Sequence, residues 1–336
     1  MDMNQPAPSN ALDDNLQGLM GKPVDRVDGR LKVMGKATYS HEVQEGGQPA
    51  YGFILEASIA KGTVAEIDTG AAERCAGVLL VMTHQNAPKQ AAWGPITEED
   101  RFARSTPQLG SNRIEYYGQA VAFVVAQSFA QARSAAHLIK VTSAATPGEF
   151  ELAPSLAKAE KPADNKYLKT DSIVGEFEPA FAAAPVKFDA TFTTPIHIHA
   201  QMEPHATLAY WKDGRVIIHC SSQLLESAQK AIAHTLQIAP EQVRIVSRYI
   251  GGGFGGKLGI YGDVFLSAMA SRVLKRPVKT ALTRQQMFHL TGHRPTIALG
   301  RDERWDTKPG RTVHALTIFL RAPARRRERC TQPRIA

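Results

Sequence analysis

The chain has 336 residues, of which 43% are hydrophobic and 21% are charged. This composition supplies enough apolar material for two or three globular domains and excludes a disordered tail or a disulfide-rich miniprotein. The formal net charge of +8 lies mainly in residues 321–336, which carry +5, so residues 1–320 carry only +3. Because no aromatic residues alternate with the tail arginines and no nucleic-acid module precedes them, the charge does not favour nucleic-acid binding.

Residues 1–20 are polar and rich in Pro and Asn, which predicts a disordered or loosely docked arm. From residue 21 onward, short apolar strands alternate with one helix. The predicted strands are 51–57, 65–67, 78–83, 119–126 and 138–142, and the predicted helix is 129–137. Strand, helix and strand in succession indicate an α/β domain over residues 21–143.

Residues 144–174 change to Ala, Pro, Lys, Glu and Asp with little periodicity, which predicts a linker. A second α/β region follows over residues 175–300. Its predicted elements are the strand 186–193, the hairpin 207–211 and 215–220, the helix 224–236, the strand 243–250, the helix 262–274 and the strand 278–282. Residues 301–336 form an atypical basic tail.

Cys75, Cys220 and Cys330 are odd in number and far apart. They exclude a disulfide framework and a cysteine-rich zinc or iron–sulfur site within this chain. The first twenty residues contain no Lys or Arg, so the charged region of a signal peptide is missing. The longest apolar runs, 77–82 and 120–126, are too short to span a bilayer. We therefore expect a cytoplasmic location, or a periplasmic one through co-export with a signal-bearing partner.

The strongest local signal is the sequence Gly-Gly-Gly-Phe-Gly-Gly-Lys at residues 251–257, called the glycine loop below, between a predicted strand and a predicted helix. Such a loop exposes N–H groups to an anionic ligand and lets it approach the main chain. A phosphate-binding P-loop fits the spacing, but Leu258 stands where a magnesium-binding hydroxyl is needed. A dinucleotide fingerprint also fits, but no acidic residue lies between Asp263 and Asp302 to bind a ribose. A tight structural turn is the remaining alternative.

His197, His199 and Glu203 have the spacing of a cupin-type metal triad, but the glycines that flank a cupin motif are absent. We favour the alternative that these side chains stabilise a loop between domains. Gln223 and Phe254 each follow a predicted strand, where α/β folds place their ligands. No Gly-x-Ser-x-Gly sequence occurs, so no hydrolase triad is predicted.

Several motifs in chain order resemble the molybdenum-binding large subunit of the xanthine dehydrogenase and aldehyde oxidase family. The matching motifs are Val-Asp-Gly at 27–29, Gly-Lys-Ala-Thr-Tyr at 35–39, Glu-Tyr-Tyr-Gly-Gln-Ala-Val-Ala at 115–122, Gln-Met-Glu-Pro-His-Ala at 201–206, Ser-Gln at 222–223 and the glycine loop. The sequence Leu-Thr-Arg-Gln-Gln-Met-Phe at 282–288 is most similar to bacterial aldehyde oxidoreductase large subunits.

The resemblance implies an α/β (α+β) protein, with a hammerhead-like α/β domain followed by part of a molybdopterin-binding α/β domain. It implies a molybdopterin molybdenum cofactor, in its simple or its cytosine dinucleotide form, at which aldehydes are oxidised to carboxylic acids or heteroaromatic carbons are hydroxylated. Iron–sulfur clusters and FAD would lie on partner subunits, because this chain lacks the cysteine motifs for the clusters. No nucleic-acid or membrane partner is expected.

By the same resemblance, Gln223 and Phe254 contact the molybdenum end of the cofactor, and Gly253 and Gly255 lie beside them. The amide of Gln223 can donate a hydrogen bond to an oxo group. Purine-oxidising members have a glutamate where this chain has Leu258. The leucine at the substrate therefore favours aldehydes over xanthine.

Family subunits continue well beyond the length of this chain, and from about residue 300 the resemblance ends. We expect the general-base glutamate and the further pterin contacts to lie beyond the chain end, so no catalytic residue is assigned here. The hypothesis is a truncated or frameshifted subunit whose 336 residues alone are inactive. The alternatives are a non-catalytic scaffold or assembly fragment of such a complex, and a nucleotide-binding protein.

Overall fold

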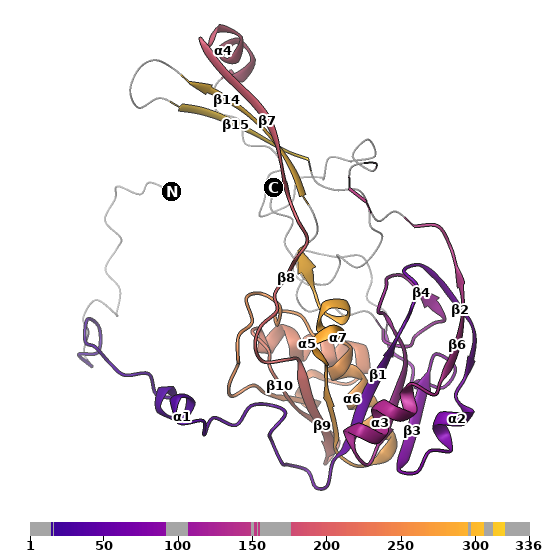
Figure 1. The fold of residues 1–336 in the computed structure, drawn as a ribbon. Helices are drawn as coiled ribbons and strands as arrows, with labels where there is room; N and C mark the ends of the chain where they lie inside the picture. The colour runs from indigo at the N-terminus through magenta and orange to yellow at the C-terminus, as the bar shows by residue number, and fades with distance from the viewer. Residues whose placement is uncertain are drawn as a thin grey trace. The chain divides into compact units, whose positions relative to one another are not determined.

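The computed structural model describes residues 15, 17–91, 107–148, 151–152, 154, 176–294, 297–305 and 312–319. The chain divides into two compact units, Met1–Thr38 and Tyr39–Ala336. The first unit contains the short helix α1 (Gly29–Val33), labelled in Figure 1. The carboxylate of Asp28 precedes this helix and pairs with Arg26 Nε at 3.0 Å and with Lys32 Nζ at 2.7 Å.

A mixed sheet of seven strands is the centre of the second unit. In spatial order its strands are β11 (Val243–Val246), β10 (Arg215–Cys220), β9 (Ala206–Lys212), β12 (Val278–Ala281), β1 (Ala50–Glu56), β5 (Ala120–Ala126) and β3 (Val78–Thr83). The pairs β10/β11 and β1/β12 are parallel, and the other pairs are antiparallel. All seven residues of β5 are buried, as expected for an apolar strand with neighbours on both sides.

Three helices cover this sheet (Figure 1). Helix α3 (Phe129–Ala136) packs on β1 and β5, and α6 (Gly262–Leu274) packs on β9 and β12. Helix α5 (Leu225–Leu236) packs on β11. Residues of α6 belong to two of the apolar cores, one shared with β1 and β5 and the other with β10 and α5. Strands β1 and β5 are therefore covered on both faces, by α3 on one and by α6 on the other, whereas α5 and α6 cover the same face of β10.

The described residues of the second unit also form three smaller sheets. Their strands are β4 (Arg113–Ile114), β2 (Gly62–Asp68) and β6 (Lys140–Ala145) in the first; β13 (His293–Arg294) and β8 (His197–Ile198) in the second; and β15 (Thr312–Phe319), β14 (Ile297–Trp305) and β7 (Val186–Thr194) in the third. The remaining helices are α2 (Gly70–Glu73), α4 (Phe177–Ala183), α7 (Arg284–Leu290) and the 3-10 helix Pro240–Gln242.

The elements predicted between residues 51 and 282 are present, with two differences. The strand predicted over 243–250 ends at Val246, because the chain leaves the ladder before the glycine loop. The succession β5, α3 and β6 is not a crossover within one sheet, because β6 pairs with β2 in a separate sheet. Short elements such as α7 and β8, and the strands after residue 296, were not predicted.

Most of the predicted arm and linker, and the tail after residue 319, lie outside the described residues. In the described part of the atypical basic tail, residues 301–305 belong to β14 and residues 312–319 form β15. The domain boundaries proposed from the sequence stay a prediction. Among the described residues, no helix is both long and apolar enough to cross a membrane.

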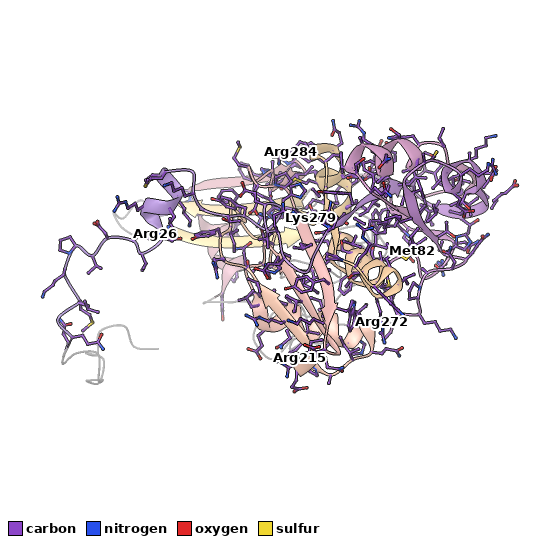
Figure 2. All side chains as sticks on the ribbon, turned by 90° about the horizontal axis from the view of Figure 1, so that it is seen from below. Arg26, Met82, Arg215, Arg272, Lys279 and Arg284 are labelled. Atoms are coloured by element: carbon purple, nitrogen blue, oxygen red, sulfur yellow. The ribbon has the colours of Figure 1, made fainter. Side chains whose placement is uncertain are left out.

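Two cations labelled in Figure 2 connect distant segments of the second unit. Lys279 of β12 donates from its buried Nζ to the carbonyl of His41 at 2.9 Å. Arg284, the first residue of α7, donates to the carbonyls of Gln201 at 2.6 Å and of Met202 at 3.0 Å. The guanidinium thereby fixes the main chain immediately before Glu203.

Candidate functional site

The glycine loop has an unusual backbone at its centre. Gly252, Phe254 and Gly255 have φ angles of 94°, 51° and 91°. Glycine adopts such angles without strain, whereas Phe254 is a bulky residue in the left-handed region, which costs free energy unless the surroundings enforce it. The side chain of Phe254 is 77% exposed, so its own packing within this chain does not explain the conformation.

The N–H groups of the loop fall into two sets. Those of Gly255 and Lys257 donate to the amide oxygen of Gln223, and that of Gly256 donates to the carbonyl of Gly253 at 2.7 Å. The consecutive N–H groups of residues 252–254 have no protein acceptor within the described part of the chain. Adjacent main-chain donors of this kind form a site for an anion or for an electron-rich oxygen.

Gln223 lies against the loop as the sequence predicts. Its Oε1 is 3.2 Å from the amide nitrogens of Gly255 and of Lys257, and its own N–H donates to the Lys257 carbonyl at 2.8 Å. A Cβ built on Gly253 would lie 2.5 Å from Gln223 Oε1, so a larger residue at this position would displace the Gln223 side chain. Because the oxygen faces the loop, the amide nitrogen of this exposed side chain is left to donate elsewhere.

A second set of polar groups holds the ends of the loop. Glu203 Oε2 accepts from Gly251 N and from Lys257 Nζ, both at 2.7 Å, and Glu203 Oε1 accepts from Ser221 Oγ at 2.6 Å. We call Glu203, Lys257 and Ser221 the Glu203 cluster. The Lys257 side chain has no exposed surface and that of Glu203 is 11% exposed, and burial lowers the pKa of Lys257. Lys257 is therefore paired inside the protein and does not extend towards a phosphate.

The histidines of the same segment also contact the loop or its surroundings. His205 Nε2 lies 3.1 Å from the carbonyl of Gly256, and His199 Nδ1 lies 3.2 Å from that of Gly292. His197 is exposed on β8. No three His, Cys, Asp or Glu residues in the described ranges come together as a metal site. The structure thus places Glu203 on Lys257 instead of in the cupin-type triad considered from the spacing.

Leu258, the residue predicted to face the substrate, is half-buried directly after the loop. A Cβ built on Gly255 would lie 3.9 Å from Leu258 Cδ1 and 3.6 Å from His199 Nε2. These distances place an apolar side chain and an imidazole on the same side of Gly255. Burial lowers the pKa of His199, which favours its neutral form.

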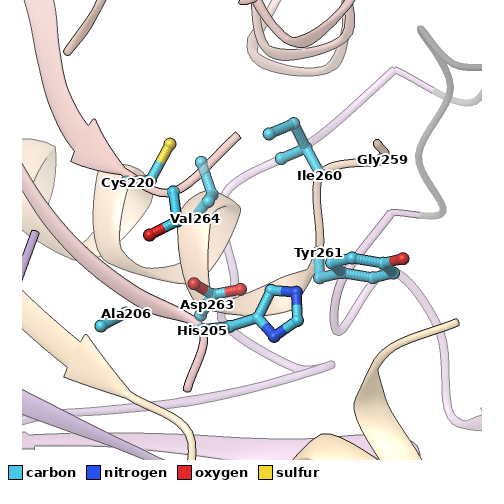
Figure 3. A pocket seen from close by; sticks show the side chains of 9 residues that line it. His205, Ala206, Cys220, Gly259, Ile260, Tyr261, Asp263 and Val264 are labelled. Carbon is cyan, nitrogen blue, oxygen red and sulfur yellow. The ribbon is translucent and has the colours of Figure 1, made fainter. Parts of the chain in front are cut away.

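A cavity of about 10 Å³, with room for about one water molecule, is lined by residues at the start of β9, at the end of β10 and at the start of α6 (Figure 3). Its lining includes His205, Cys220 and Asp263. Asp263 Oδ2 accepts from Thr207 Oγ1 at 2.8 Å, while Oδ1 has no hydrogen-bond partner among the residues that the structure describes. Burial raises the pKa of Asp263 to about 6, lowers that of His205 to about 3 and raises that of the Cys220 thiol.

The sequence interpretation identified Gln223, Gly253, Phe254, Gly255 and Leu258, and the structure brings these five together. Their roles towards a cofactor or substrate stay a prediction. The interpretation assigned no partner to Lys257 and no role to the buried Asp263. The sequence contains one indirect signal for the partner of Lys257. No Ser or Thr follows this lysine, so it is not the lysine of a P-loop, and its ammonium group needs an acceptor other than a phosphate.

Two family models match the chain. Residues 34–147 match the a/b hammerhead domain of aldehyde oxidase and xanthine dehydrogenase, and residues 158–300 match a molybdopterin cofactor-binding domain. The chain is 40% identical over 308 residues to the aldehyde oxidoreductase molybdenum-binding subunit PaoC of Escherichia coli O157:H7, covering 90% of this chain and 40% of the relative. It is 27% identical over 282 residues to the xanthine dehydrogenase molybdenum-binding subunit of the same organism, covering 82% and 37%.

Solved structures show the same fold. Quinoline 2-oxidoreductase from Pseudomonas putida 86 superposes with a TM-score of 0.70 at 21% identity, covering 87% of this chain and 38% of that chain. The aldehyde oxidoreductase from Desulfovibrio gigas superposes with a TM-score of 0.65 at 23% identity, covering 83% and 32%. This chain spans about 40% of the length of the aldehyde oxidoreductase subunit that it matches.

Proposed function

Because this chain belongs to the aldehyde oxidase and xanthine dehydrogenase family, we propose that it supplies the hammerhead domain and the first part of the cofactor-binding domain of a molybdenum hydroxylase. The observation that carries the proposal is the row of three free N–H groups at residues 252–254 beside the amide of Gln223. We assign the region 34–147 to the first domain and 158–300 to the second, after the family matches.

The residues of the site fit a molybdopterin cofactor. The N–H groups of residues 252–254 can donate to its electron-rich oxygen atoms, and glycine at 252, 253 and 255 keeps side chains away from the main chain. The amide nitrogen of Gln223 can donate to an oxo group, because its oxygen is held by two loop amides. When bound, the cofactor supplies the two-electron redox centre and the water-derived oxygen for oxidation of a C–H bond.

The residues present also bear on the substrate. Leu258 and the exposed ring of Phe254 provide apolar surface beside Gly255, next to the imidazole of His199. The Glu203 carboxylate is already bonded to Lys257 and is not free to anchor a purine. We propose aldehydes, oxidised to carboxylic acids, as the substrate class. The proton acceptor for the reaction is not assigned to a residue of this chain, and the glutamate that the family resemblance implies stays a prediction.

In this proposal, the electrons released by substrate oxidation pass to redox centres on partner subunits. Among the described residues only Cys75 and Cys220 are cysteines, and neither forms a disulfide. Two separate thiols do not hold an iron–sulfur cluster, so we assign the clusters and the FAD to partner subunits. We propose a cytoplasmic complex, with export on a signal-bearing partner as the alternative.

The test is the molybdenum content of the full chain, produced together with molybdenum-cofactor maturation enzymes and purified with its partner subunits. The expected result is bound molybdenum in the wild type. In Gly253→Ala the added Cβ, 2.5 Å from Gln223 Oε1, displaces the glutamine and lowers the molybdenum content. Gly70→Ala, in α2, is the matched control and leaves it unchanged. A folded wild-type chain that never retains molybdenum would favour the non-catalytic scaffold instead.

A further inference from the structure

The Glu203 cluster joins three segments of the site through one carboxylate. Gly251 is the first residue of the glycine loop, Lys257 is the last, and Ser221 is two residues before Gln223. All three donate to Glu203, at 2.7, 2.7 and 2.6 Å. The main-chain N–H of Glu203 also donates to the carbonyl of Gly251 at 3.1 Å. We infer that Glu203 is the positioning residue that sets the shape of the glycine loop.

The two ends of the loop depend on Glu203 to different degrees. Lys257 is also held through its main chain, since its N–H and C=O both bond to Gln223. Gly251 has no such second support: its N–H and its C=O both bond to Glu203, and to no other described residue. Loss of Glu203 therefore releases the first half of the loop, while Gln223 still holds the second half.

Burial makes the contacts of the carboxylate strong. Lys257 has no exposed surface, so water does not compete for its ammonium group. Hydrogen bonds in which one partner is ionised are about twice as strong as neutral ones. An isosteric amide at position 203 has one oxygen in place of two, so it can accept from Gly251 only with its NH2 group turned towards Ser221 Oγ, and it loses the charge. It also leaves a buried ammonium ion without a counter-ion.

The consequence for function lies at the centre of the loop. Residues 252–254 carry the three free N–H groups, and Phe254 is held in a left-handed conformation. Such a conformation persists only where the surrounding structure enforces it. With both ends fixed by Glu203, the three donors keep a fixed arrangement; without it, the loop relaxes and that arrangement is lost. What these donors bind rests on the proposed function, but their positioning does not.

The test is amide hydrogen exchange, followed by mass spectrometry on the full chain without cofactor, in peptides that cover residues 251–257. Two variants are compared with the wild type: Glu203→Gln, and Glu203→Gln combined with Lys257→Met, which leaves no unpaired buried charge. We expect exchange of the Gly251 amide, the loop N–H group that donates to Glu203, to quicken about tenfold in both variants, because a charge-assisted bond becomes a neutral one. Exchange in peptides from β5 stays at the wild-type rate.

The double variant separates positioning from general stability. Because it buries no unpaired ion, its denaturant midpoint returns towards that of the wild type, while the Gly251 amide still exchanges faster. Glu226→Gln removes an exposed carboxylate that pairs with Lys230 at 2.7 Å and serves as the matched control, with no change in the loop. Wild-type loop exchange in the double variant would overturn the inference.

Molybdenum content distinguishes this inference from the proposed function. If the wild-type chain retains molybdenum, both Glu203 variants are expected to retain at least about tenfold less, in line with the loop opening. If the wild type retains none but the loop exchanges faster in the variants, the proposed function fails and the positioning role of Glu203 stands. If loop exchange is unchanged, the positioning role fails whatever the molybdenum content.

Discussion

The layer between α3 and the central sheet differs in construction from the region around the glycine loop. The first is an apolar core, with Phe53, Val124 and the alanines of α3 among its buried residues. The second buries Glu203, Lys257 and Asp263, whose contacts are hydrogen bonds and an ion pair. In the apolar layer, stability follows the buried area and substitutions act gradually. In the polar region, stability depends on each buried charge keeping its counter-ion. Removing one member of a buried ion pair therefore costs more free energy than removing both members.

The largest effect is expected in the apolar layer. Phe53 is 6% exposed and its ring meets that of Phe129 edge-on at 5.9 Å. Phe53→Ala should lower the free energy of unfolding by roughly 3–4 kcal/mol, from lost burial and the cavity left behind. Chemical denaturation measures this. The control is Phe192→Ala on β7, where the ring is 47% exposed and the loss should stay below about 1 kcal/mol. Equal losses would contradict the account of the core.

In the polar region, a single substitution should lower the free energy of unfolding more than a double substitution does. Lys257→Met leaves the carboxylate of Glu203 without its counter-ion and should cost roughly 3 kcal/mol. Adding Glu203→Gln should recover part of that loss, although it removes a second partner. A double-mutant cycle by urea denaturation gives the coupling, which we expect to exceed about 1 kcal/mol. Additive losses would show that the two side chains do not act as a pair.

Asp263 adds a pH dependence to the polar region. Burial raises its pKa from 3.8 to about 6, so the folded protein binds this proton more tightly than the unfolded chain. Its contribution to stability is therefore present below about pH 4 and is lost as the pH rises to about 6, by roughly 2–3 kcal/mol. Asp263→Asn removes this dependence.

The measurement for Asp263 is the difference in unfolding free energy between variant and wild type at pH 4 and pH 7. The difference should move in favour of Asp263→Asn as the pH rises. Burial lowers the pKa of His205 to about 3, so protonation of this histidine destabilises the folded protein as the pH falls. Both proteins contain His205, so its contribution cancels in the difference between them. Asp213→Asn, in the β9–β10 turn, is the control and should show no such trend.

The smallest effect is expected at the helix cap of α3, in the apolar layer. Ser128 caps α3 by accepting the N–H of Gln131 at 3.3 Å. Ser128→Ala should cost about 1 kcal/mol in unfolding free energy. Because α3 contributes nothing to the Glu203 cluster, exchange of the loop amides should be unaffected. Faster loop exchange in this variant would mean that the two regions are coupled through the sheet.

The same contrast explains what the sequence could predict. Local patterns identified β5 through seven consecutive apolar residues, and the β9–β10 hairpin through Asp213 and Gly214, which both have a positive φ. They also identified the glycine loop, because a strand followed by glycines marks a ligand-binding turn. Gln223 was noted for its place after a strand, and its proposed role came from the family resemblance. These features depend on neighbours in sequence, so their physics is visible in a short window.

Pairings between distant residues could not be predicted in this way. Glu203 and Lys257 are 54 positions apart, and no periodicity relates them. The insertion of β12 between β9 and β1 joins residue 278 to residue 50, which no local pattern indicates. The strand β14 has its partner in β7, more than a hundred residues earlier. Such contacts are decided by the tertiary fold rather than by propensity.

The position of β12 has a consequence for any attempt to divide the protein. Its parallel pairing with β1, in which Ala50 faces Val278, joins the segments that match the two family models into one hydrogen-bonded sheet. A chain cut between residues 148 and 176 would leave each fragment with an open, apolar strand edge. Such edges recruit other strands, so separate fragments would aggregate. Produced together, they have the complementary edges needed to reassemble as a split protein.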